Sequence, residues 1–200
     1  MQQKVVIVNT GCANISSVRI ALEKLGSSVL VTADADAIHQ ADKVLLPGVG
    51  SAGAAMKSIE QKKLTNVIQG LTQPVLGVCL GMQLMVSRSE ESQTGSVSCL
   101  DLIPGDVVRM QVGTKRLPHM GWNTVSATAQ SELFKGIPDN TYFYFVHSYC
   151  VKPSSYTLAE CHYAQPFSAA LMKDNFYGVQ FHPERSGEAG AQLLRNFLDL

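Results

Sequence analysis

Residues 74–83 read Pro74-Val-Leu-Gly-Val-Cys-Leu-Gly-Met-Gln83. The apolar run Pro74–Val78 predicts a short buried strand, and the residues from about Gly81 predict a helix. Cys79 stands between them, with Gly77 two positions before it and Gly81 two positions after it. This G-x-C-x-G spacing is the thiol form of the nucleophile elbow, which needs glycines because a β-carbon would collide with the neighbouring backbone. The stretch therefore predicts the strand–turn–helix unit of an α/β fold.

The elbow would place the thiol of Cys79 at the N-terminus of the following helix. The positive end of the helix dipole favours a thiolate over a thiol, which is what a nucleophilic cysteine requires. A lone cysteine in an apolar run is more often a small buried residue. The two flanking glycines favour the other interpretation, and we predict that Cys79 is a nucleophile.

Towards the N-terminus the chain alternates between strand and helix patterns. Strands are expected over Lys4–Asn9, Ser28–Thr32 and Lys43–Leu46, and helices over Asn14–Leu25 and over a continuous or broken region, Ser51–Gln69. This rhythm predicts a doubly wound, mostly parallel sheet with helices on both faces.

The second half of the chain predicts many strands and one closing helix. A polar loop is expected over Glu90–Ser98 and the last helix over Ser186–Leu200. The expected strands, several separated by turn residues, are Val107–Met110, Trp122–Val125, Thr141–His147, Thr157–Cys161, Phe167–Lys173 and Phe176–Gln180. Antiparallel pairing is expected here. The chain shows no repeat and no linker, so we expect one domain over residues 1–200.

The composition excludes several classes of protein. Of the 200 residues, 46% are apolar and 16% charged, which suits a packed soluble core. The net charge is zero, so neither nucleic acid nor an anionic membrane is an expected partner. The apolar run Val5–Val8 is too short for a signal peptide or a membrane span, and we expect a cytoplasmic protein. Five cysteines without a C-x-x-C pair predict free thiols and no structural zinc site.

His182-Pro183-Glu184 follows the last expected strand and supplies a candidate base. In an extended chain the two outer residues would share one face, about 6–7 Å apart at the backbone. Pro183 favours extended geometry at His182. His182 would then accept the thiol proton while Glu184 orients the ring. On its own the pair would more often be an exposed turn, and His147, at the end of a strong strand, is the rival base.

Leu46-Pro47-Gly48-Val49-Gly50 follows the third strand. In a doubly wound sheet, ligands bind at the carboxyl ends of the strands. We expect the N–H groups of Val49 and Leu80 to form an oxyanion hole, with Gly48 and Gly50 next to the substrate. Alone, the segment would equally suit a tight turn between a strand and a helix.

These motifs resemble the triad-type (class I) glutamine amidotransferases. The resemblance is carried by Gly77-Val-Cys-Leu-Gly-Met-Gln83, Pro47-Gly-Val-Gly50 and His182-Pro-Glu-Arg-Ser186. Within that class, the full 200 residues resemble the glutaminase subunits of imidazole glycerol phosphate synthase. The more specific segments are Leu117–Asn123, Tyr144–Tyr149 and Tyr177–Ser186.

The resemblance implies a reaction and a partner. Glutamine would be hydrolysed to glutamate, and ammonia would pass to a (β/α)8-barrel cyclase in a heterodimer. The cyclase would combine the ammonia with phosphoribulosyl-formimino-AICAR-phosphate to give imidazole glycerol phosphate and AICAR. By resemblance, Gln83 and backbone groups around Ser148 and Tyr149 hold glutamine, while Trp122 and Arg185 lie near the cyclase. No cofactor and no metal is implied.

The first turn, Asn9-Thr-Gly-Cys-Ala-Asn14, departs from the commoner family form. That form has an aromatic residue at position 10 and glycine at position 13. We interpret the departure as a variant of a turn near the interface that leaves the catalytic residues unaffected.

Three other functions remain as alternatives. One is the glutaminase subunit of pyridoxal phosphate synthesis, which typically carries P-G-G-E-S where this chain has Pro47-Gly-Val-Gly-Ser51, or the subunit of purine synthesis. Another is a non-catalytic protein on the same scaffold, which would be expected to lose one residue of the triad. The third is a peptidase with a Cys–His pair, which an assay for peptide cleavage would detect.

Overall fold

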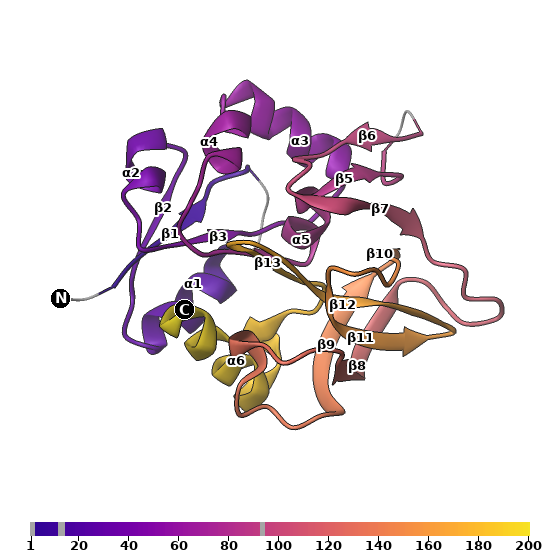
Figure 1. Ribbon diagram of the computed structural model, residues 1–200. Coiled ribbons are helices and arrows are strands. Elements are labelled where there is room, and N and C mark those ends of the chain that lie inside the picture. Colours follow the sequence, from indigo (N-terminus) through magenta and orange to yellow (C-terminus); the bar gives the residue numbers. More distant parts are fainter. Residues whose placement is uncertain (1–2, 12–14, 93–94) are drawn as a thin grey trace.

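The computed structural model describes residues 3–11, 15–92 and 95–200. Its main feature is a nine-stranded sheet in the order β2-β1-β3-β4-β13-β12-β11-β8-β9 (Figure 1). The first five of these strands are parallel. They are β2 (Ser28–Thr32), β1 (Lys4–Val8), β3 (Lys43–Leu46), β4 (Val75–Val78) and β13 (Phe176–Val179).

The other four strands of this sheet are antiparallel to their neighbours. They are β12 (Gln165–Lys173), β11 (Thr157–Tyr163), β8 (His119–Ala127) and β9 (Thr141–His147). The predicted fold class, a mostly parallel doubly wound sheet with antiparallel strands in the second half, is confirmed. Strand β13 pairs antiparallel with β12, as expected, and in addition parallel with β4. The hairpin from β12 sets the direction of β13, and that direction matches the first-half strands.

A second sheet of four short strands lies beside the main one, in the order β10-β7-β5-β6. Its strands are β10 (Tyr149–Val151), β7 (Ile103–Arg109), β5 (Val86–Ser89) and β6 (Val97–Ser98). Only part of β7 was predicted, and β6 falls inside the expected polar loop. Strands of two to four residues are too short to show a period of two, so β5 and β10 are defined by pairing with β7, and β6 by pairing with β5.

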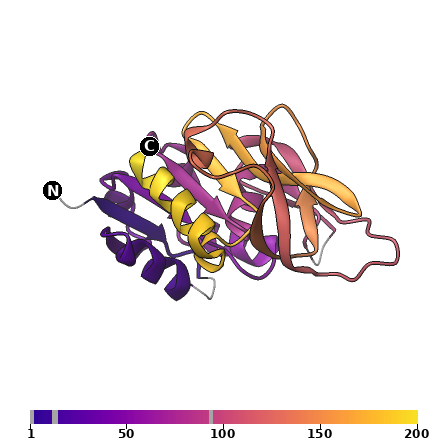
Figure 2. The same ribbon diagram turned by 90° about the horizontal axis from the view of Figure 1, so that it is seen from below.

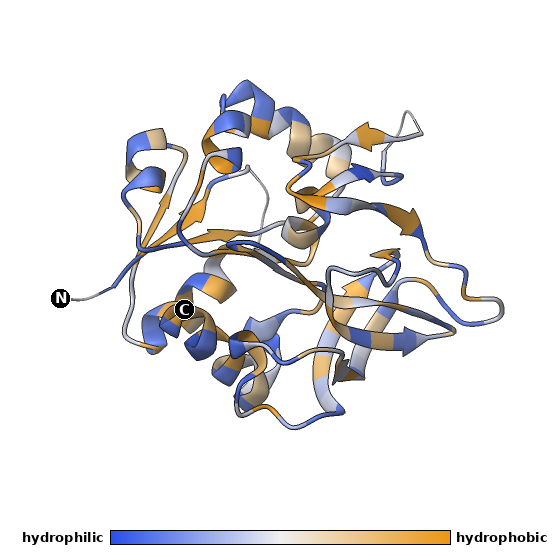
Figure 3. Cartoon of the chain, viewed as in Figure 1, coloured by the Kyte–Doolittle hydropathy of each residue, from blue (hydrophilic) through white to orange (hydrophobic). Residues whose placement is uncertain are grey.

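The strands of the parallel half present alternate side chains to two apolar clusters. Val5 and Ile7 belong to one cluster and Val6 and Val8 to the other. The first cluster also contains residues from α1 (Ile15–Lys24) and α6 (Gly187–Asp199), which cover the same side of the sheet in Figures 1 and 2. Figure 3 shows the apolar residues of these strands between helices whose outer faces are polar.

The opposite side carries three helices, α2 (Ala35–His39), α3 (Ala52–Gln61) and α4 (Thr65–Gln69). The predicted region 51–69 is broken at residues 62–64, where Lys63 has a φ of 57°. Helix α2 was missed because its five residues show no helical period. Its N-terminus is capped by Asp34, whose side chain accepts a hydrogen bond from the Ala37 N–H. No helix of the described ranges is both long and apolar enough to cross a bilayer.

Strands β3, β4 and β13 are adjacent and parallel, so their carboxyl ends meet at one edge of the sheet. They are followed there by the loop 47–50, by Cys79 and by the segment 180–182. Three segments far apart in the sequence thus reach one place, which is where an open α/β sheet binds its ligand.

Candidate active site

The turn after β4 has the geometry of the predicted elbow. Cys79 has φ 53° and ψ −110° and precedes α5 (Leu80–Met85). A β-carbon on Gly81 would lie 1.8 Å from the Leu46 carbonyl oxygen, and one on Gly77 would lie 2.7 Å from the Met82 nitrogen. Both glycines are therefore required by close backbone contacts, as the spacing predicted.

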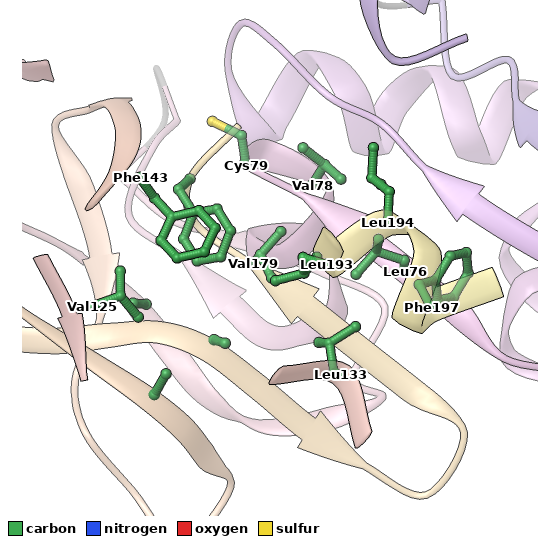
Figure 4. Packing of buried hydrophobic residues seen from close by; sticks show 14 of the residues in the cluster. Leu76, Val78, Cys79, Val125, Leu133, Phe143, Val179, Leu193, Leu194 and Phe197 are labelled. Atoms are coloured by element: carbon green, nitrogen blue, oxygen red, sulfur yellow. The ribbon is translucent and has the colours of Figure 1, made fainter. Parts of the chain in front are cut away.

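The thiol of Cys79 is 8% exposed and points away from the apolar cluster behind it (Figure 4). Its sulfur lies 3.9 Å from the Val146 carbonyl oxygen and 3.8 Å from Gln180 Nε2. The cysteine is thus close to polar groups from β9 and from the segment after β13.

His182 and Glu184 form a buried pair beside this thiol. His182 Nδ1 lies 2.9 Å from Glu184 Oε1, and their side chains are only 5% and 3% exposed. His182 is extended, with φ −100° and ψ 96°, as expected before a proline. The extended geometry expected through Glu184 is wrong, because Pro183–Arg185 form the 3₁₀ turn η2. Proline suits the first position of such a turn, and the turn brings the carboxylate back to the ring.

Two buried atoms of the pair have no hydrogen-bond partner among the described residues, His182 Nε2 and Glu184 Oε2. Unpaired buried polar atoms are rare and call for an explanation, which a reacting group supplies. Burial alone would lower the pKa of His182, but Cys79 and Glu184 outweigh it and raise that pKa to about 10. The pair is therefore suited to hold a proton on the His182 ring beside the Cys79 sulfur.

Cys79 and His182 border a cavity of about 320 Å³, and Glu184 lies behind His182 without lining it. Its walls include most of the expected site residues: Val49, Gly50, Cys79, Leu80, Gln83, Ser148, Tyr149, His182 and Arg185. Gly48 does not line it. A β-carbon on Gly48 would lie 2.8 Å from the Leu80 Cβ, so this glycine lets the loop 47–50 pack against the elbow.

His147, the rival base, also borders the cavity, but both of its ring nitrogens are engaged. Nδ1 lies 2.8 Å from the Tyr149 carbonyl oxygen, and Nε2 lies 2.9 Å from His119 Nδ1. Since a carbonyl only accepts, His147 donates from Nδ1 and its Nε2 accepts from His119. The second nitrogen of His119 lies 3.2 Å from Asn123 Nδ2. The ring of His147 binds a backbone carbonyl through Nδ1. Burial lowers the pKa of His147 to about 3, so this ring does not readily accept a proton.

Two further polar residues at the site were not predicted. Glu91 lines the cavity, accepts a hydrogen bond from the Ala52 N–H, and has a pKa raised by burial. It lies in the expected polar loop, where no pattern distinguished it. Gln180 is fully buried within hydrogen-bond distance of Cys79, and its place two residues before His182 was the signal that could have found it.

The residues expected near a partner lie at the surface. Trp122 on β8 is 56% exposed, and Arg185 is exposed at the rim of the cavity. In the unusual first turn, Thr10 is fully buried, while residues 12–14 lie outside the described residues.

The geometry suits nucleophilic attack on a small polar acyl compound. A thiol, an imidazole–carboxylate pair and a glycine-rich loop meet at one cavity large enough for an amino acid. The model of the family described as glutamine amidotransferase class-I matches residues 6–200. The chain is 54% identical over 196 residues to the imidazole glycerol phosphate synthase subunit HisH of Salmonella typhimurium, covering 98% of this chain and 99% of that protein. The chain belongs to the class-I glutamine amidotransferases, in the HisH family.

A second relative agrees with this family, and solved structures share the fold. The HisH subunit of Vibrio parahaemolyticus is 52% identical, and the match covers 100% of this chain and 99% of that one. Solved structures share the fold of the class-I amidotransferases at low identity. PurLQS from Thermotoga maritima has a TM-score of 0.71 at 16% identity, covering 100% of this chain and 99% of that one. The glutaminase domain of Trypanosoma brucei CTPS has a TM-score of 0.66 at 15% identity, covering 99% and 94%.

Proposed function

We propose that this chain is the glutaminase subunit of imidazole glycerol phosphate synthase and hydrolyses glutamine with Cys79, His182 and Glu184. The observation that carries the proposal is the meeting of the Cys79 elbow and the buried His182–Glu184 pair at one cavity. Family membership supplies the reaction class, a glutamine amidotransferase of histidine biosynthesis.

In this mechanism His182 Nε2 takes the proton from the Cys79 thiol, and the sulfur attacks the side-chain carbonyl carbon of glutamine. The oxyanion that forms accepts hydrogen bonds from the N–H groups of Val49 and Leu80. The intermediate collapses to a thioester as ammonia leaves with the proton from His182. His182 Nε2 then takes a proton from the water that attacks the thioester and passes it to the sulfur as the C–S bond breaks and glutamate is released. Glu184 keeps the ring in the correct tautomer throughout.

The cavity offers complementary groups to the two charged ends of glutamine. Glu91 presents a carboxylate suited to the α-ammonium group, and Arg185 presents a cation at the rim. Gln83 of α5 and the backbone at Ser148 and Tyr149, between β9 and β10, hold the substrate, and Gly50 approaches it from the loop. Gly48 contributes by keeping that loop against the elbow.

A (β/α)8-barrel cyclase is the partner in this proposal. Three large exposed side chains, Met120, Trp122 and Tyr142, are 62%, 56% and 59% exposed on β8 and β9. Met120 is directly opposite Val146, which lines the cavity. Exposed apolar groups gathered in this way mark a protein interface, and this one would let ammonia pass on without reaching solvent. The chain acts in the cytoplasm as a single domain over residues 1–200.

Replacing Cys79 with alanine tests the proposal. We expect the complex with the cyclase to lose glutamine-dependent synthesis completely and to keep ammonia-dependent synthesis, because the cyclase chemistry belongs to the partner. A glutamine-analogue affinity label should attach at Cys79 of the unaltered chain. Labelling at another cysteine, or synthesis from glutamine by Cys79→Ala, would contradict the assignment.

A further inference from the structure

Gln180 is a polar side chain with no exposure to solvent, between β13 and His182. Its backbone N–H donates to the Ala169 carbonyl oxygen at 2.9 Å, which continues the strand pairing of β13 with β12. The side chain does not line the cavity. Burying a carboxamide costs free energy unless both its oxygen and its NH₂ group are hydrogen-bonded, so each is expected to have a partner.

The surrounding hydrogen bonds fix which way the carboxamide faces. The Tyr149 carbonyl oxygen can only accept, and it accepts from Gln83 Nε2 at 3.0 Å. The same amide nitrogen donates to Gln180 Oε1 at 2.8 Å. With its oxygen engaged in this way, Gln180 turns its NH₂ group towards the Cys79 sulfur, 3.8 Å away.

The Tyr149 carbonyl is itself held by the histidine pair. His147 Nδ1 donates to it at 2.8 Å, and His119 in turn engages the other nitrogen of His147. Hydrogen bonds therefore connect β8 to the nucleophile through the Tyr149 carbonyl oxygen, which accepts from both His147 Nδ1 and Gln83 Nε2. Such a network rigidifies the groups in it and leaves the Gln180 amide one orientation.

The two neighbours of the sulfur distinguish the thiol from the thiolate. The Val146 carbonyl oxygen, 3.9 Å from the sulfur, can accept only from a protonated thiol. The Gln180 NH₂ group can donate to either form, and it binds a charged acceptor more strongly than a neutral one. Loss of the thiol proton thus weakens the contact with Val146 and strengthens the contact with Gln180.

We propose that Gln180 is a further catalytic residue of this site, whose buried amide donates a hydrogen bond to the Cys79 sulfur and stabilises the thiolate. The inference rests on the proposed function, in which Cys79 is the nucleophile. Other titratable groups face Cys79 across the cavity and are left unchanged by the test: Glu91, His147, Tyr149, His182 and Arg185.

The test measures the thiolate directly, by the rate at which iodoacetamide alkylates Cys79 in the complex with the cyclase, from pH 5 to pH 10. Peptide mass spectrometry assigns the adduct to Cys79. Gln180→Met keeps the length and bulk of the side chain but removes the donor. At pH values below the midpoint of the rate–pH profile we expect alkylation to slow about tenfold, the low end for a hydrogen bond to a charged group. The midpoint of the rate–pH profile should move up by about one unit.

The chain offers a matched control. Gln165 Nε2 donates to the Cys150 sulfur at 3.6 Å, so it makes the same kind of contact to a cysteine outside the cavity. Burial raises the pKa of Cys150 to about 11, which keeps its own alkylation slow. Gln165→Met should leave the alkylation of Cys79 at the rate of the unaltered chain.

A second variant keeps the test decisive if Gln180→Met fails to assemble with the cyclase. Gln180→Glu preserves the shape and the oxygen that accepts from Gln83, but it places a carboxylate oxygen near the sulfur. Its alkylation should be slowed at least as much. Unchanged rates in whichever variants assemble would overturn the inference, while Cys79→Ala would still test the proposed function. If alkylation is slowed but Cys79→Ala still synthesises product from glutamine, the Gln180 contact is supported and the assignment of Cys79 as the nucleophile is wrong.

Discussion

At the scale of single residues, burial strengthens the polar contacts of the site. The His182–Glu184 pair is nearly inaccessible to solvent, with one free nitrogen facing the thiol side of the cavity. In such a setting an ion pair is screened far less than at the surface. The imidazolium formed during turnover therefore depends strongly on Glu184.

Variants of this pair should be severely impaired in glutamine hydrolysis. His182→Ala removes the base and should lower turnover by at least about 10³-fold, nearly as much as loss of the thiol, because residues of a triad act as a unit. Glu184→Gln keeps the imidazole and should retain more activity. The measurement is glutamine turnover by the complex at saturating glutamine. Full turnover by Glu184→Gln would show that the carboxylate of Glu184 is not needed to orient His182.

His147 should make the protein sensitive to acid. Burial lowers its pKa to about 3, while in the unfolded chain the ring titrates near 6.5. The unfolded state thus binds a proton below pH 6.5 that the folded state refuses until about pH 3. Stability from this residue is complete above pH 6.5 and falls by about 1.4 kcal/mol per pH unit below it.

The measurement is urea unfolding of the unaltered chain and of His147→Asn between pH 7 and pH 4.5. Asparagine does not titrate, and it can still donate to the Tyr149 carbonyl oxygen. The variant should lose less stability over this range than the unaltered chain. Parallel losses would show that His147 does not cause the acid sensitivity.

At the scale of elements, η2 and α6 set the position of the catalytic carboxylate. A β-carbon on Gly190 of α6 would lie 1.9 Å from the Pro183 carbonyl oxygen. The Ser186 hydroxyl donates to the His182 carbonyl oxygen at 2.7 Å and closes the same turn. Glycine at position 190 therefore lets the helix pack directly on the turn that carries Glu184.

Gly190→Ala should displace η2 and impair glutaminase activity by about tenfold or more, with ammonia-dependent synthesis retained. Alanine normally stabilises a helix by about 1 kcal/mol relative to glycine, so a loss of stability here would report the clash. Ala191→Gly, on the same helix, is the control. It should lower stability while leaving glutamine turnover unchanged, and equal turnover in both variants would argue against the positioning role of Gly190.

At the scale of the whole molecule, the cavity lies between the two halves of the chain. The parallel half contributes the loop 47–50 and the elbow, while β9 and β10 contribute residues 146–149. The exposed Tyr142 lies on β9, which reaches the cavity, and the exposed Trp122 lies on β8, which pairs with β9. A partner bound to those strands is well placed to influence the site.

We expect the isolated chain to hydrolyse glutamine poorly. Gly50 is exposed with a φ of 96°, and glycines on both sides let the Val49 peptide change orientation at little steric cost. Addition of the cyclase and its nucleotide ligand should raise turnover at least about a hundredfold, the value of one restored oxyanion donor. Turnover of the chain alone, with the cyclase, and with the cyclase plus ligand is the measurement, and equal rates would exclude the switch.

Gly50→Pro tests the loop in the same assay. Proline cannot adopt a φ of 96° and has no N–H, so the loop must change its conformation. Stimulation by the cyclase and its ligand should fall more than the affinity between the subunits, which titration of one subunit with the other measures.

The sequence by itself determined the elements that show a strong local pattern. The strands Ser28–Thr32, Lys43–Leu46 and Thr141–His147 were predicted to the residue, because their apolar side chains need no partner to be recognised. The turn at Cys79 was predicted for a similar reason, since its two flanking glycines are required by close backbone contacts. Gly77 lies against residues 81–82, and Gly81 lies against Leu46 on the adjacent strand. His182 and Glu184 were predicted as the base and its carboxylate partner because they are two positions apart in the sequence.

Only the tertiary structure decided what depends on distant segments. It showed that a 3₁₀ turn, and not an extended chain, brings Glu184 to His182, and that His147 is occupied by His119 and Tyr149. It also showed that Gln180 reaches Cys79 from 101 positions away. Hydrogen bonds between segments so far apart leave no period or spacing in the sequence, because their geometry exists only once the sheet has placed the strand ends together.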